Sequence, residues 1–268
     1  HCKAKHMSWL HCFWGIGATG GPYIMGLCLS RGMGWQAGYR TISFLQMALT
    51  LILLLSLPLW KKQELPLSGG ETVRPQTPQW GKLLKRPGVK AALTAFFFYS
   101  ALELTTGLWG SSYMVAVRGI SPETAAKWIS LFYLGITAGR FFSGFLTLRF
   151  SDDAMVRLGE GTAIVGILLM LLPLHNLFLC LGLILTGLGC APIYPSLLHA
   201  TPQRFGKSLS QSLMGTQMAI SYLGSTTMPP VSGFLSEKIS MGLYPILLLV
   251  FALCMTILTE KGRHCTAE

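Results

Sequence analysis

The sequence predicts an all-α integral membrane protein with about eight transmembrane helices. Hydrophobic residues make up 51% of the 268 residues and charged residues only 12%, whereas a soluble domain carries about 25% charged residues. The apolar residues fall into blocks of about 20, the length that crosses a hydrocarbon core of about 30 Å. Helices of a soluble domain would instead have one polar face. These observations favour a helical membrane bundle over a soluble domain.

Eight apolar blocks are long enough to be spanning helices. Short segments rich in Lys, Arg, Pro and Gly separate them. The expected spans are residues 8–29, 39–60, 88–117, 125–148, 158–174, 177–198, 209–231 and 242–259. Residues 61–87 form the longest segment without apolar character, and they contain several prolines. This composition predicts a linker between two halves of the protein.

The basic residues predict the orientation of these spans. With a cytoplasmic N-terminus, most of the 21 Lys and Arg residues fall on the cytoplasmic side, as the positive-inside rule requires. The linker and both termini are then cytoplasmic, and we expect a multi-pass protein of the cell membrane. The net charge of +11 does not indicate nucleic-acid binding, because the charges lie at the ends of apolar blocks rather than in one basic stripe.

The sequence offers no chemistry of the kind that enzymes use. The seven cysteines form no CxxC pair, and most of them fall inside apolar blocks, so they read as small buried side chains. No metal-ligand cluster, GxSxG motif or phosphate-binding loop is present. We therefore expect neither an enzyme nor an ATP-driven pump, and no metal or cofactor.

The start of the chain predicts a fragment. The first residue is His1, and the first apolar block is too long for a signal peptide and leads directly into a second span. We expect a chain that begins within a longer protein.

The first predicted span carries a glycine–proline motif. It reads Gly17-Ala-Thr-Gly-Gly21-Pro22-Tyr-Ile-Met25-Gly26. It resembles the GxxxGPxxGG signature in the fifth helix of the major facilitator superfamily, with Met25 in place of one Gly. Glycines four residues apart allow close helix packing, and Pro22 permits a bend. The signature is typical of export antiporters.

Three further motifs carry the same resemblance. The third span has Tyr99, Glu103, Gly107, Trp109 and Tyr113 at the spacing YxxxExxxGxWxxxY, similar to the seventh helix of the fucose-permease-like branch. Gly187 to Ser196, which includes Tyr194, and then Thr201 to Gly206 resemble the tenth helix of that branch and the loop that follows.

The remaining motif lies between the fourth and fifth spans. Gly139, Arg140, Gly144 and Arg149 resemble the second copy of the family's GxLxDRxGR loop. Leu148 stands where the family has its acid, and Asp152 and Asp153 follow closely and could take its place.

The resemblance implies a fold and an activity. The chain would correspond to helices five to twelve, with residues 1–60 as two helices of the N-terminal bundle and residues 88–268 as a complete C-terminal bundle. It implies a secondary transporter of a small polar solute that works by alternating access, with a sugar-like substrate and proton coupling as the first expectation. The alternatives are a drug or metabolite efflux antiporter and a truncated membrane protein that transports nothing. The oligomeric state stays open.

The charged residues inside the spans are the leading site candidates. Glu103 is the one acid deep in an apolar block, and Arg140 is the one base. An intramembrane acid commonly marks a proton or substrate site, and we hypothesise a Glu103–Arg140 pair across adjacent helices. The alternatives are a neutral Glu103 bonded to a hydroxyl and an Arg140 that extends toward the cytoplasm.

Polar and aromatic residues complete the predicted site. Tyr99, Glu103, Thr106 and Tyr113 share one helical face, which we expect to line a water-filled cavity, with Trp109 at its flank. The alternative is that the aromatic residues simply pack in the bundle. Tyr133 shares a face with Arg140, and Tyr194 and Gln217 are further candidates. Glu160, one turn after Arg157, predicts an ion pair at the membrane boundary.

Overall fold

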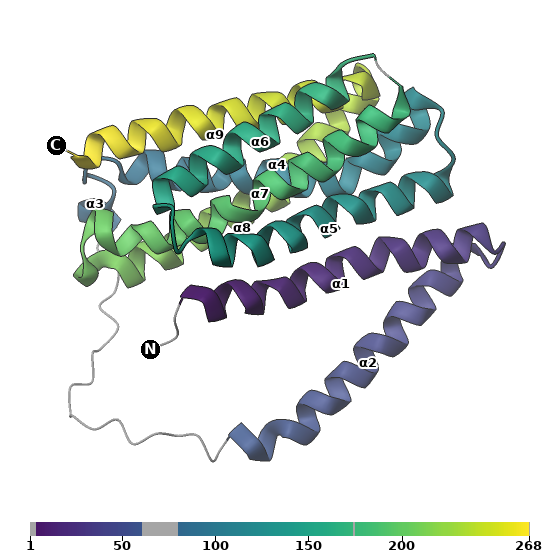
Figure 1. The fold of residues 1–268 in the computed structure, drawn as a ribbon, viewed down its shortest axis with the longest axis horizontal. Coiled ribbons are helices and arrows are strands. Elements are labelled where there is room, and N and C mark those ends of the chain that lie inside the picture. Colours follow the sequence, from purple (N-terminus) through teal and green to yellow (C-terminus); the bar gives the residue numbers. More distant parts are fainter. Residues whose placement is uncertain (1–3, 61–79, 174, 268) are drawn as a thin grey trace.

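The computed structural model describes residues 4–60, 80–173 and 175–267 (Figure 1). These residues form α-helices and one short 3-10 helix, with no strand among them. The elements are α1 (Ala4–Ser30), α2 (Gly34–Trp60), α3 (Trp80–Leu83), α4 (Val89–Arg118), α5 (Pro122–Leu146), α6 (Asp152–Leu171), α7 (Asn176–Phe205), α8 (Lys207–Lys238), η2 (Met241–Leu243) and α9 (Tyr244–Ala267). The all-α membrane prediction is confirmed. Of the predicted linker, residues 61–79 lie outside the described residues.

Helices α4 to α9 pack into one bundle (Figure 1). In it α4 lies against α8 and α9, α6 lies against α7 and α9, and α5 lies against α7. Large apolar side chains such as Phe96, Phe132, Ile167 and Leu183 are fully buried among them. The start of α1 and the end of α9 lie at the same end of the molecule (Figure 1), as an even number of crossings requires.

Glycines allow the closest helix approaches in this bundle. A Cβ on Gly166 of α6 would lie 2.6 Å from the carbonyl oxygen of Gly182 on α7, and one on Gly182 would lie 2.6 Å from that of Gly166. A Cβ on Gly139 of α5 would lie 2.5 Å from the Ala191 Cβ on α7. Backbones in such contact gain van der Waals packing, the main attraction between helices in lipid.

The rest of the predicted loop motif is less tightly packed into the bundle. Gly144 is buried near the end of α5, whereas Arg149 is exposed in the turn that leads to α6.

Helix α1 packs along α5, and α2 turns back beside α1 and diverges from the bundle (Figure 1). Gly17 and Gly21 do not make the close contact with α5, because a Cβ on either would meet nothing within 4 Å among the described residues. Gly15 and Gly26 make it instead: their Cβ atoms would lie 2.2 Å from Thr137 Oγ1 and 3.0 Å from Lys127 Cγ. At about 100° per residue, Gly15 and Gly26 share a face that Gly17 and Gly21 do not. Pro22 lies within α1, which continues through it.

Six of the described helical segments are long and apolar enough to cross a membrane. They are Gly34–Leu59, Val89–Arg118, Pro122–Leu146, Asp152–Leu171, Asn176–Phe205 and Met241–Cys265. The other two predicted spans correspond to α1 and α8, which have 27 and 32 residues and lie along α5 and α4. Among the described residues, neither helix has a stretch that is apolar enough to count as a span by composition alone.

Candidate functional site

The centre of the candidate site is an ion pair between α4 and α5. Arg140 Nη2 lies 3.7 Å from Glu103 Oε1, and both side chains are 8% exposed. The turn between these helices brings the two residues together. Gly119 ends α4 with φ of 64°, where glycine is favoured. Ser121 then caps α5 and Pro122 occupies its first turn. The pairing hypothesised from the sequence is present in the structure.

Three tyrosines from three helices surround this pair. The Tyr99 hydroxyl of α4 donates a hydrogen bond to the Cys190 carbonyl oxygen at 3.2 Å and lies within electrostatic reach of both charged groups. Tyr194 of α7 lies beside it, with ring centroids 5.7 Å apart. Tyr133 of α5 lies close to Glu103 and over Gly107, whose added Cβ would be 2.0 Å from the Tyr133 hydroxyl oxygen. We call these five side chains, Tyr99, Glu103, Tyr133, Arg140 and Tyr194, the central cluster.

The other residues predicted on the face of Glu103 lie elsewhere. Thr106 and Tyr113 are buried in helix contacts: the Thr106 hydroxyl donates to the Leu102 carbonyl at 2.7 Å, and the Tyr113 ring stacks on Tyr244 at 5.1 Å. The Tyr244 hydroxyl in turn donates to the Thr106 carbonyl at 3.0 Å. The expectation that this face lines a water-filled cavity is therefore corrected: its four residues are buried, and Tyr244 of α9 covers Thr106 and Tyr113.

Trp109 and Gln217 also join helices to one another. The Trp109 indole N–H donates to the Pro229 carbonyl at 2.8 Å, and its ring lies over Gly233 on α8. Gln217 Oε1 accepts from the Thr201 hydroxyl at 3.0 Å. These contacts hold α4 to α8 and α7 to α8. The structure does not bring either residue to the central cluster.

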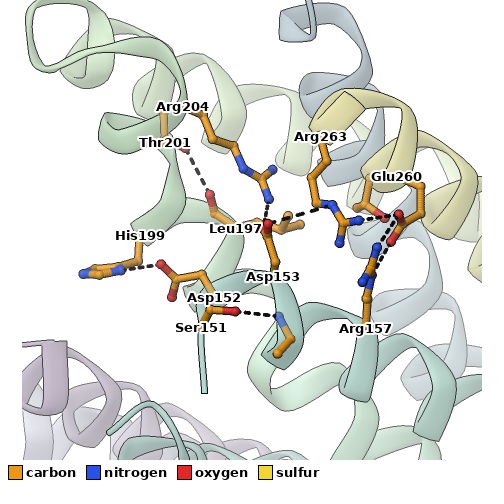
Figure 2. A network of polar contacts seen from close by, with 12 residues as sticks. Ser151, Asp152, Asp153, Arg157, Leu197, His199, Thr201, Arg204, Glu260 and Arg263 are labelled. Atoms are coloured by element: carbon orange, nitrogen blue, oxygen red, sulfur yellow. Dashed lines mark hydrogen bonds and ion pairs between the residues drawn. The ribbon is translucent and has the colours of Figure 1, made fainter. Parts of the chain in front are cut away.

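A second group of charged residues lies where α6 begins and where α7 and α9 end (Figure 2). Asp153 of α6 binds Arg204 of α7, and its other oxygen lies 3.8 Å from Arg263 Nε on α9. Asp152 Oδ2 lies 2.8 Å from His199 Nδ1. We call this group, with Arg157 and Glu260, the end network. The two aspartates predicted to replace the missing acid of the loop motif thus bind basic residues within the same bundle.

The structure corrects the predicted partner of Arg157. This arginine donates from Nε and Nη2 to the two carboxylate oxygens of Glu260 on α9, at 2.8 and 3.0 Å (Figure 2). Glu160, the expected partner, is only 2% exposed and contacts Thr259 instead. Helical spacing placed Glu160 near Arg157 but could not show that α9 supplies a better aligned acid. The sequence analysis therefore missed Glu160 as a second buried acid.

Within the described residues, no group of three or more His, Cys, Asp or Glu side chains could hold a metal ion.

Comparison with known proteins identifies the family. Residues 104–263 match the model of the Major Facilitator Superfamily. The chain belongs to this superfamily. The matched region begins within α4, one residue after Glu103, and ends near the C-terminus of α9. It therefore covers most of the six-helix bundle.

Individual relatives agree with this assignment. The yeast protein "Bypass of stop codon protein 6" (Saccharomyces cerevisiae) is 23% identical over 197 residues, which are 68% of this chain and 38% of the relative. A crystal structure of the E. coli Fucose:proton symporter FucP superposes with a TM-score of 0.58 at 20% identity, over 69% of this chain and 44% of that one.

A further FucP structure, in the outward conformation, superposes with a TM-score of 0.61 at 18% identity, over 85% of this chain and 54% of that one. These superpositions show the fold. The superposition covers 85% of this chain, which is more than residues 88–268 make up. It therefore includes part of the chain before the bundle. The chain spans about two fifths of the curated relative's length and about half of the structures' lengths.

Proposed function

We propose that this chain is part of a secondary active transporter rather than an enzyme, with residues 88–268 as its C-terminal bundle, residues 1–60 as two helices of its N-terminal bundle and residues 61–87 as the linker. Family membership and the FucP-like fold support this proposal. In such transporters two bundles move around a site near the middle of the membrane. The central cluster lies on α4, α5 and α7 of this bundle, and it is our candidate for such a site.

The buried ion pair is the observation on which the function rests. A charge in the middle of a membrane costs at least about 2.5 kcal/mol, so it persists where it has a partner or a function. Glu103 and Arg140 neutralise each other's charge. The distance of 3.7 Å from Arg140 Nη2 to Glu103 Oε1 is longer than that of a well-formed hydrogen bond. Such a loose pair is easily exchanged for other partners. Protonation of Glu103 would release Arg140 to bind a substrate oxygen, and this couples protons to substrate.

The tyrosines support a class of substrate. Tyr99, Tyr133 and Tyr194 give the cluster aromatic surfaces, hydroxyl donors and hydroxyl acceptors beside the two charges. Aromatic rings pack on the apolar face of a sugar, and charged groups bond to its hydroxyls. We infer a small polar, sugar-like solute moved together with protons. FucP, which has the same fold, is named as a fucose:proton symporter, and this supports the same class of substrate.

Uptake measurements test this function. Proteoliposomes containing the chain, or the longer protein where the gene encodes one, should accumulate a labelled sugar only when a proton gradient is imposed. Glu103→Gln should abolish accumulation driven by the gradient, and Glu260→Gln, an acid of the end network, should not. Accumulation that is unchanged in Glu103→Gln would contradict proton coupling through this residue.

The same measurement distinguishes the alternative functions. Loss of a preloaded solute against its gradient would instead show the efflux antiporter. The glycine motif that favours efflux gains no support from the structure, since Gly17 and Gly21 make no close contact with other described residues. A chain that moves no solute in either direction, in a gene without further spans, would be the non-transporting membrane protein.

We also propose that the protein spans the cell membrane with both termini in the cytoplasm. The Lys and Arg distribution supports this orientation, and the start of α1 and end of α9 lie at one end of the molecule (Figure 1). Protease protection of tags at the two termini in sealed vesicles would test it. Both tags should be digested in inside-out vesicles and protected in right-side-out vesicles.

A further inference from the structure

Glu160 is a buried carboxyl group that plays no part in the proposed transport site. It lies on α6, eight residues after Asp152, so about 12 Å along the helix from its first residue. Its side chain is 2% exposed. One oxygen, Oε1, lies 2.7 Å from the Thr259 hydroxyl of α9. The other oxygen, Oε2, has no hydrogen-bond partner among the described residues.

The basic residues near Glu160 are bound to other acids. Arg157, on the same helix, uses its Nε and Nη2 groups on Glu260. On α9, Arg263 binds Glu260 and Asp153. Glu260 itself adds a second negative charge next to Thr259 and so disfavours another carboxylate nearby. Arg157, one turn away, is the base whose charge favours an ionised Glu160, but its guanidinium is bonded to Glu260, and no base of the described residues forms an ion pair with Glu160.

The helix on the other side of α6 supplies no cation either. At Gly159, the residue before Glu160, α7 presents Gly189, Pro192 and Ile193, none of which titrates. The basic residue near the end of α7, Arg204, binds Asp153. A buried carboxylate without a cation is far less stable than the neutral acid.

The hydrogen bonds of Thr259 agree with a neutral acid. Its hydroxyl lies 2.7 Å from Glu160 Oε1 and 2.9 Å from the Thr256 carbonyl oxygen. A threonine hydroxyl has one hydrogen to donate and can also accept. The Thr256 carbonyl can only accept. The Thr259 hydroxyl is placed to donate to Glu160 Oε1 and to the Thr256 carbonyl, but it has one hydrogen for the two. Both contacts are two-centre hydrogen bonds only when that hydrogen goes to Thr256 and a protonated Glu160 donates to Thr259.

We propose that Glu160 is a proton-binding site, protonated while α6 and α9 are in contact and ionised when water enters between them. On separation of these helices the proton passes from the Glu160 carboxyl to water and leaves a hydrated carboxylate. This site is distinct from the central cluster on α4, α5 and α7. It makes the contact of α6 with α9 stronger in acid than in alkali, whether or not Glu103 couples protons to transport.

Infrared spectroscopy of the chain in lipid bilayers tests the proposal directly. A protonated carboxylic acid has a carbonyl band that an ionised carboxylate lacks, so this band at neutral pH reports an acid that keeps its proton. We expect this band in the wild type and its loss in Glu160→Gln, with the band retained in the controls Glu103→Gln and Glu260→Gln. A wild type without the band, or a Glu160→Gln variant that keeps it, would overturn the proposal.

Two further measurements assign the band even if Glu160→Gln fails to fold. Labelling with ¹³C-glutamate should shift the band in the wild-type protein, whereas ¹³C-aspartate should leave it unchanged. Thr259→Val, which removes the hydroxyl at nearly constant volume, should move the band to higher frequency without removing it. A band that shifts with labelled aspartate, or that ignores the loss of the Thr259 hydroxyl, would exclude Glu160 as its source.

Discussion

The central cluster and the end network use the same chemistry in different surroundings. In the central cluster, Arg140 and Glu103 are both 8% exposed and lie 3.7 Å apart. In the end network, Arg157 and Glu260 are 58% and 31% exposed and form two short hydrogen bonds. The better geometry thus belongs to the more exposed pair.

The two groups of ion pairs differ in what they contribute to the stability of the bundle. Exposed ion pairs contribute little because water already solvates both charges. Buried pairs seldom stabilise more than apolar residues would, but the loss of one partner is costly. The central pair therefore stabilises the contact of α4 with α5 no better than apolar side chains would. Its presence favours a role in function rather than in stability. The end network joins the ends of α6, α7 and α9, and its partly exposed charges lose little hydration in doing so.

The largest expected effect comes from breaking the central pair on one side. Glu103→Gln leaves the buried Arg140 without its counter-charge, so we expect a loss of about 3–5 kcal/mol of stability. Unfolding in detergent micelles, followed by circular dichroism, would measure it. The double variant Glu103→Gln with Arg140→Gln should recover most of the loss, since no uncompensated charge remains. A double variant as unstable as the single one would contradict the pairing.

A smaller effect should follow from displacing one tyrosine of the central cluster. A methyl group on Gly107 would lie 2.0 Å from the Tyr133 hydroxyl oxygen, so Gly107→Ala must move that ring and should cost about 1–3 kcal/mol. Gly161→Ala is the matched control, because its Cβ would meet nothing within 4 Å and alanine favours the helix by about 1 kcal/mol. The same thermal unfolding assay compares them. Equal stability of the two variants would show that Tyr133 is not held over Gly107.

Within the end network, Asp153 is 47% exposed but should matter more than Arg157, because both of its basic partners are largely buried. It binds Arg204, whose side chain is 14% exposed, and also approaches Arg263. Asp153→Asn should lower the free energy of unfolding by about 1 kcal/mol, since both interactions lose their negative charge. A double-mutant cycle with Arg204→Gln would measure the coupling. Strictly additive losses would mean that the two side chains do not interact in solution.

The smallest effect is expected at Arg157. Because its side chain is 58% exposed, Arg157→Gln should cost about 0.5 kcal/mol or less. High salt should remove this difference, because the Debye length falls to about 3 Å at 1 M. The effect of Glu103→Gln should persist in the same salt, since its pair is buried. If high salt reduced the stability loss of Arg157→Gln and that of Glu103→Gln equally, the central pair would be no better shielded from solvent than the end network.

The fold was largely predictable from the sequence because it depends on local properties. Apolar runs and the charges that end them identified the spans, and isolated charges within those runs identified Glu103 and Arg140. Hydropathy was less informative for α1 and α8, which are not among the six apolar spans found in the described residues. The family motifs predicted the superfamily and its helical fold, which the family model and the superposition on FucP confirm.

The contacts of individual side chains required the tertiary structure. The sequence by itself determined the membrane-spanning helices and the two charged residues that the membrane makes costly, because both follow from the composition of single segments. Only the tertiary structure decided that Tyr113 packs on Tyr244, that Gly15 rather than Gly17 meets α5, and that Glu160 is buried against Thr259. Helical periodicity fixes which residues share a face. The neighbouring helix decides whether that face meets lipid, water or protein.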